Sequence, residues 1–251
     1  MEVFNISLPT SWDELSNKQL LMVYGLFARD LSAAEVKTLC LMKWNGLKVL
    51  ATLPGHRFLI KREKEPEVAL STRQIQQATS VLDFLDSFAP MPVRIERIGK
   101  YRALPADFEK VPFDEFLFVE NLFQGYLNNQ SDELLLQMAQ VLYASDHVKP
   151  SQAHLVGMFY WMASLKQYFA SLFPNFYKPV SSNGSGNLLG NGQPDIYSQL
   201  RESTNAMIRA LTGGDITKES AIMKMDTWRA LTELDAKARE AEELRKAMKK
   251  P

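Results

Sequence analysis

The stretch from Pro150 to Leu172, PSQAHLVGMFYWMASLKQYFASL, decides the fold because it predicts the central helix of the core. Pro150 and Ser151 are typical of a helix start. One apolar stripe then recurs at spacings of three and four residues, the period of a helix with a buried face. Its members are Leu155, Met158, Met162, Leu165, Phe169 and Leu172. Phe159, Tyr160 and Trp161 carry the apolar surface around most of the circumference, which favours a core position over a cofactor site.

Capping signals predict further helices on the N-terminal side. Ser-x-x-Glu/Gln patterns begin at Ser11, Ser16, Ser32 and Ser71, and in each the serine can accept a hydrogen bond from a first-turn amide. The last three patterns precede apolar residues at helical spacing. They predict helices over 17–29, 32–45 and 71–88. The apolar periods after Phe113 and Ser131 predict two more.

Two β-rich regions interrupt this helical pattern. LKVLATLPGHRFLIKRE contains the turn dipeptide Pro54-Gly55 and predicts a hairpin around residues 47–62. VRIERI, followed by Gly99 and KYRAL, predicts a second hairpin around 93–104. The expected fold class is therefore mainly α with a small antiparallel β-sheet, an α+β protein.

A glycine-rich stretch, SSNGSGNLLGNGQPD from Ser181 to Asp195, separates two helical regions. Its G-x-G-x-x-x-G spacing is neither the dinucleotide fingerprint nor the Walker loop, and no strand precedes it. The composition indicates a flexible joint. We expect a mainly helical domain over 1–180, a linker over 181–194 and a C-terminal helical module over 195–251.

Composition narrows the functional classes. The 251 residues include 29 basic and 29 acidic side chains, which argues against a surface built wholly for nucleic acid or anionic membrane. No secretory signal or long apolar run is present, so a cytoplasmic protein is expected. The single cysteine, Cys40, lies in an apolar run and is interpreted as a buried small hydrophobe.

No residue pattern indicates catalysis. The histidines are His56, His147 and His154, and none has the spacing that places two imidazoles on one helix face. We therefore predict no catalytic, cofactor-binding or metal-binding residues, no cofactor, and a protein that is not an enzyme. An enzyme whose groups come from distant positions is the alternative.

Charge is unevenly distributed. Residues 103–148 contain eight acidic side chains against Lys110 alone, which indicates either a docking face for a basic partner or solvated helix faces. The two hairpins are basic, and together they offer a nucleic-acid-binding alternative with interleaved aromatics. The residues of that alternative are Arg57, Arg62, Arg94 and Arg97.

The last helix, predicted from Asp226 to about Met248, has a narrow apolar seam. Its anchors Trp228, Leu231 and Leu234 are spaced for helix-in-groove recognition, so we predict that they bind a partner. The same seam is compatible with packing on the main domain or on a second copy of the chain, which would make a homo-oligomer.

Four stretches carry a family resemblance. They are LPTSWDELSNKQLLMVYGLF, AEVKTLCLMKWNGLK, FLFVENLFQGYLNNQSDELLLQMAQVLYA and RALTGGDITKESAIMKMDTWRALTELDAKAREAEEL. They resemble proteins of prophage tail modules in Bacteroidetes-type bacteria and, more loosely, phage tail assembly chaperones. The resemblance implies a non-enzymatic, chaperone-like assembly factor that keeps a helical tape-measure-like protein soluble while the tail tube forms. It transfers no site residues.

Overall fold

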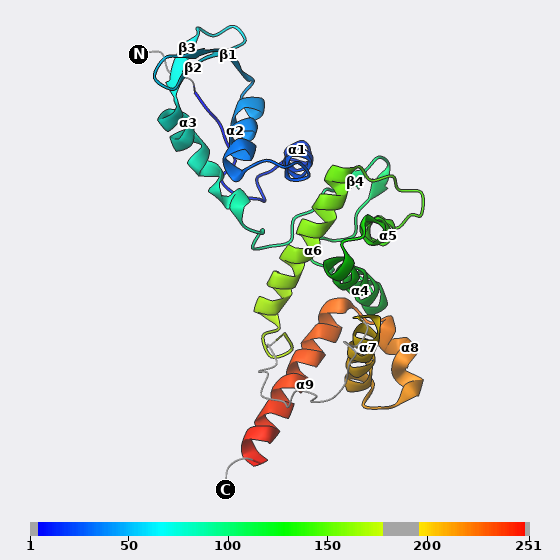
Figure 1. Cartoon of the computed structure of the whole chain (residues 1–251). Helices are drawn as coiled ribbons and strands as arrows, with labels where there is room; N and C mark the ends of the chain where they lie inside the picture. The colour runs from blue at the N-terminus through cyan, green and yellow to red at the C-terminus, as the bar shows by residue number, and fades with distance from the viewer. Residues whose placement is uncertain (1–4, 178–195, 249–251) are drawn as a thin grey trace, which may run out of the picture. The chain divides into compact units, whose positions relative to one another are not determined.

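The computed structural model describes residues 5–177 and 196–248. Figure 1 shows the helices and strands. They are α1 (Asn17–Phe27), α2 (Ala33–Trp44), β1 (Leu47–Leu53), β2 (Arg57–Arg62), β3 (Val68–Ser71), α3 (Thr72–Thr79), the 3-10 helix η1 (Ser80–Asp86), β4 (Arg97–Ile98), β5 (Tyr101–Arg102), α4 (Phe113–Asn129), α5 (Asp132–Leu142), α6 (Gln152–Leu172), α7 (Ile196–Thr212), the 3-10 helix η2 (Ile216–Lys218), α8 (Glu219–Met223) and α9 (Thr227–Met248). Most described residues are helical and the strands pair antiparallel, so the predicted α+β class is confirmed.

The chain forms two compact units. Among the described residues, the first unit comprises 5–89, 93–96 and 149–160, and the second unit comprises 90–92, 97–148, 161–177 and 196–248. The predicted boundary near residue 180 therefore differs from the observed division. The physical reason is that α7 and α9 both contact α4, so the C-terminal helices share a core with the middle of the chain. The predicted linker, 181–194, lies outside the described residues.

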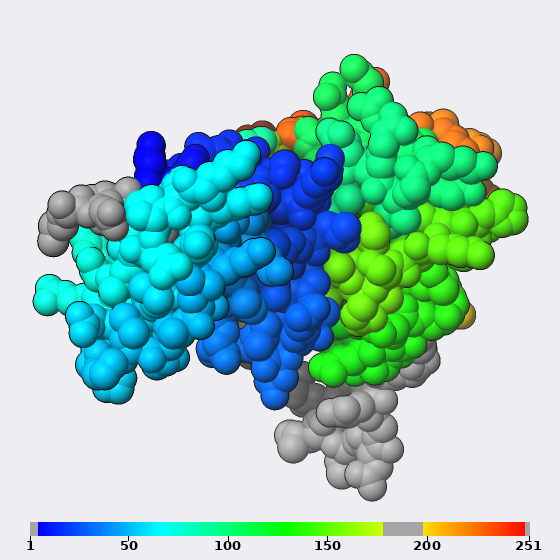
Figure 2. Space-filling view, turned by 90° about the horizontal axis from the view of Figure 1, so that it is seen from above, coloured from blue at the N-terminus to red at the C-terminus, as the bar shows by residue number. Residues whose placement is uncertain are grey.

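The first unit contains a three-stranded sheet in the order β1-β2-β3. β1 and β2 meet at Pro54-Gly55 and pair Leu47 with Arg62, so the predicted hairpin is confirmed. A bulge shifts the register between Val49 and Ala51. β3 was not predicted, because its four residues end at Ser71, the capping serine of α3. In the space-filling view, the strands form a continuous light-blue to cyan surface (Figure 2).

Three of the four predicted capping boxes form. Ser16, Ser32 and Ser71 each accept a hydrogen bond from the backbone N–H three residues later, while the Glu or Gln there accepts one from the serine N–H. The pattern at Ser11 caps no helix. Its glutamate, Glu14, instead accepts hydrogen bonds from the backbone N–H and hydroxyl of Thr10. These boxes set where α1, α2 and α3 begin.

The third predicted helix is shorter than expected. α3 ends at Thr79, and the chain continues as the 3-10 helix η1 to Asp86. The hydroxyls of Thr79 and Ser80 donate to carbonyls three residues earlier. Such local hydrogen bonds compete with the α-helical ladder, which explains the tighter turn.

Aromatic packing builds the core of the first unit. Trp12 stacks against Tyr24, and its indole N–H donates to the carbonyls of Phe84 and Ser87. Tyr160, from the first half of α6, has its ring centroid 5.0 Å from that of Phe27. The buried rings of Trp12 and Tyr24 pack in this core among aliphatic side chains from α1, α2 and η1.

The second unit is built around α4, α5 and the second half of α6. Met162, Leu165 and Phe169 of the predicted central stripe are fully buried, which confirms a core position for α6. Trp161 is also buried, and its indole N–H donates to the carbonyl of Ala106 at 2.6 Å. Phe116 of α4 meets Phe169 edge-on, with centroids 5.7 Å apart.

The second predicted hairpin is much shorter than 93–104. Only β4 and β5 form, two residues each, around Gly99. Residues 93–96 are not a strand because they pack in the first unit. Ile95 is buried there, and the backbone N–H of Glu96 donates to the side-chain oxygen of Asn17. Among residues 5–177 and 196–248, no helix combines the length and apolar character that a membrane span requires.

Candidate functional site

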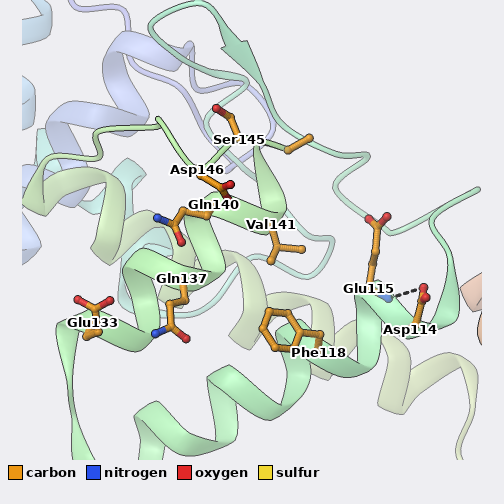
Figure 3. Close-up of a pocket in the computed structure, with 10 residues that line it drawn as sticks. Asp114, Glu115, Phe118, Glu133, Gln137, Gln140, Val141, Ser145 and Asp146 are labelled. Carbon is orange, nitrogen blue, oxygen red and sulfur yellow. Dashed lines mark hydrogen bonds between the residues drawn. The ribbon is translucent and has the colours of Figure 1, made fainter.

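A groove lies between α4 and α5 on the second unit, with a volume of about 940 Å³. Figure 3 shows its lining side chains. They are Asp114, Glu115 and Phe118 from α4, Glu133, Gln137, Gln140 and Val141 from α5, and Ala144, Ser145 and Asp146 from the turn that follows. Most of the lining surface is apolar, and the carboxylates stand around it.

The periodicity of each helix places these side chains. α4 buries Phe113, Phe116 and Val119, which leaves Phe118 on the outer side. α5 buries Leu135, Met138, Ala139 and Leu142, so its outward stripe faces the groove. Because both helices have one buried face, the groove is the surface between their outer faces.

The end of α5 shapes one end of the groove. The N–H of Ser145 donates to the carbonyl of Gln140, and the N–H of Ala144 donates to that of Val141. Ala144 has φ of 48°, in the left-handed region. Such a turn closes a helix and reverses the chain direction. It brings Ser145 and Asp146 back to the groove lining.

Phe118 is the most exposed large apolar side chain of α4, at 51% of its surface, and Leu127 follows at 49%. Phe118 lines both the groove and a second hollow, and Leu127 lines neither. The second hollow, of about 360 Å³, lies on the other side of Phe118 towards α7. It is lined by Asn121, Leu122, Gly125, Leu134, Leu200, Arg201, Thr204 and Asn205.

The groove carries negative charge. Lys224 pairs with Asp114 at 2.6 Å, and this hydrogen bond and charge raise the pKa of Lys224. The charge of Glu115 also acts on Lys224, whereas Glu133 and Asp146 form no ion pair with any described residue. Part of the acidic segment 103–148 therefore lines this groove.

The predicted partner-binding residues lie elsewhere and face their own chain. Leu231 and Leu234 are buried in the second unit. The indole N–H of Trp228 donates to the carbonyl of Asp107 at 2.7 Å, and its ring packs edge-on against Phe169 and Phe173. Of the three arrangements compatible with the sequence, the structure has the seam packed on its own chain.

The arginines of the nucleic-acid alternative are divided between two faces of one strand and between the two units. Arg57 and Arg62 lie five residues apart on β2, so their side chains leave opposite faces of the strand. The guanidinium of Arg62 is held by the carbonyls of Asn45 and Asn5 and by the carboxylate of Glu65. Arg94 belongs to the first unit and Arg97 to the second.

The nucleophile and base candidates have structural roles. Cys40 is fully buried, as predicted, and burial raises the pKa of its thiol to about 12, so the thiol stays protonated. Nδ1 of His154 lies 2.7 Å from the Ser151 hydroxyl and also accepts the Ser151 backbone N–H at 3.1 Å, just before α6. This contact caps a helix. No cluster of metal-ligating side chains occurs within the described ranges.

The chain matches no protein-family model, and no curated protein or solved structure shows significant similarity to it.

Proposed function

We propose that this protein is a non-enzymatic assembly factor of a phage or prophage tail, which binds a helical tail protein in the groove between α4 and α5. The observation that carries the proposal is the exposed ring of Phe118 at the junction of two hollows. Aromatic side chains in grooves are frequent anchors of protein interfaces. The sequence resemblance to tail-module proteins supplies the biological class.

The lining chemistry supports binding. Amide, carboxylate and apolar side chains surround the groove, a mixture typical of a surface that recognises a protein segment. The groove is formed by two ordered helices, so a partner would meet a preformed surface and lose little free energy to its reorganisation. The predicted anchors in α9 are replaced in this proposal, because Leu231 and Leu234 are already buried in their own unit.

Co-expression with the tape-measure-like protein of the same tail, followed by capture on the tagged full chain, tests the proposal. We expect Phe118→Ala to reduce capture by tenfold or more, since losing an anchor costs about 2 kcal/mol. Leu127→Ala is the matched control, because Leu127 is equally exposed on the same helix but lines neither hollow. Equal capture by both variants and the wild type would refute the proposal.

A further inference from the structure

We infer that the occupant of the groove is a basic amphipathic helix, with cations facing Glu115, Glu133 and Asp146 and an apolar residue packed on Phe118. This inference rests on the proposed function and deepens it by naming the chemistry of the partner segment. It concerns only the second unit, in which all of these residues lie.

The distribution of charge selects a basic partner. The three carboxylates come from the first turn of α4, the first turn of α5 and the turn after α5, so they surround the apolar floor. Lys224 pairs with Asp114 and also interacts electrostatically with Glu115, whereas Glu133 and Asp146 have no cation partner among the described residues. An acidic segment would meet like charges here, and a basic segment would be attracted and aligned.

The shape of the groove selects a helix. The α5 residues that line it recur at spacings of three and four, which forms a stripe along the whole helix. A second helix laid alongside presents a stripe of the same period, so its side chains can interleave with this one. α5 has 11 residues, so its stripe runs for about 16 Å and about three helical turns of a partner cover it.

The two apolar features of the groove give the partner its anchor position. Phe118 stands beside Val141 on the floor, while Glu115 lies one helical turn before Phe118 on α4. A partner helix with a leucine or aromatic residue can therefore pack on Phe118 and Val141, and a lysine or arginine beside that residue can face Glu115. Helix-in-groove recognition uses this combination of buried anchor and charged flank.

The test uses the full chain and a fluorescent 18-residue helical peptide of leucine and lysine, with leucine at helical spacing. Its counterpart has glutamate in place of every lysine. The groove variant is Glu115→Gln/Glu133→Gln/Asp146→Asn. The matched control is Glu63→Gln/Glu240→Gln/Glu243→Gln, which changes the net charge equally at exposed positions outside the groove.

We expect the lysine peptide to bind the wild type and the control variant alike. Its affinity should fall about tenfold for the groove variant, since each exposed ion pair contributes modestly. Phe118→Ala should weaken binding by a similar factor, and the glutamate peptide should not bind. Equal weakening by both triple variants, no weakening by the groove variant, or equal binding of both peptides would overturn the inference.

Capture of the co-expressed tail protein separates this inference from the proposed function. If Phe118→Ala abolishes capture and the groove variant leaves it unchanged, the partner is not basic and the inference fails while the proposed function stands. If the peptides behave as expected and no tail protein is captured, the proposed function fails and the preference of the groove for basic helices stands.

Discussion

Protonation of His154 should destabilise the start of α6. Nδ1 of His154 accepts the backbone N–H of Ser151 at 3.1 Å and lies 2.7 Å from its hydroxyl. A backbone N–H only donates, so Nδ1 is the unprotonated ring nitrogen. Gln19 and Gln74 make the same two contacts to Ser16 and Ser71. His154 thus occupies the position that Glu or Gln has in the three capping boxes and supplies the side-chain half of that arrangement.

The sign of the pH dependence follows from the pKa. Burial lowers the pKa of His154, and the lost acceptor and the positive helix N-terminus disfavour the imidazolium further. The unfolded chain, with a histidine pKa near 6.5, therefore binds the proton first as pH falls. The stabilisation is fully present above about pH 6.5 and is lost as the pH falls through the lower folded-state pKa. Loss of a capping interaction costs about 1 kcal/mol.

His154→Gln isolates this contribution, because glutamine keeps an acceptor at the position and does not titrate. We expect the variant and the wild type to have similar free energies of unfolding at pH 7.5, measured with urea. At pH 5 the variant should be more stable by about 1 kcal/mol. His147→Gln, at an exposed histidine, should keep the pH dependence of the wild type.

A direct NMR titration of His154 completes the test. A pKa at or above 6.5, or the same loss of stability on acidification in His154→Gln, would show that the imidazole does not act as a neutral cap acceptor.

Three further predictions concern other positions. Cys40 should resist thiol reagents at pH 8 until the chain is unfolded, as followed by mass spectrometry, because its thiol is buried with a pKa of about 12. Gln130→Gly should raise the free energy of unfolding by about 1 kcal/mol relative to Gln130→Ala in urea titrations, since Gln130 closes α4 with φ of 54°. Trp228→Ala should lower the melting temperature through a loss of about 3 kcal/mol, while Trp228→Phe, which loses mainly the hydrogen bond to Asp107, should cost about 1 kcal/mol.

Local sequence rules predicted the helix starts well because they describe interactions within four residues. Ser16, Ser32 and Ser71 cap helices as expected. The contact of His154 with Ser151 was missed because the pattern requires Glu or Gln at the third helical position, whereas any acceptor of suitable reach satisfies the serine N–H. Ser11 fails for the converse reason, since the carboxylate of Glu14 has a competing donor in Thr10.

Local sequence rules could not predict the groove between α4 and α5. The count of charged residues over 103–148 detected the excess of carboxylates. Glu115 and Glu133, however, line the same groove only because α4 and α5 pack side by side. The exposure of Phe118 was hidden for a similar reason. In sequence it is one aromatic among several in α4, and only the direction of the buried face distinguishes it from Phe116.

The seam in α9 shows why an apolar stripe alone cannot identify its partner. Trp228, Leu231 and Leu234 have the spacing of a recognition helix, and the same spacing serves any helix that packs on its own core. What settles their role is the loop before α4, whose carbonyl at Asp107 accepts the Trp228 N–H and whose carbonyl at Val111 accepts the Thr227 N–H and hydroxyl. These contacts span more than 110 residues of sequence. An apolar stripe that its own chain can cover is therefore a weaker sign of a partner surface than an apolar residue that the fold leaves exposed, as it does Phe118.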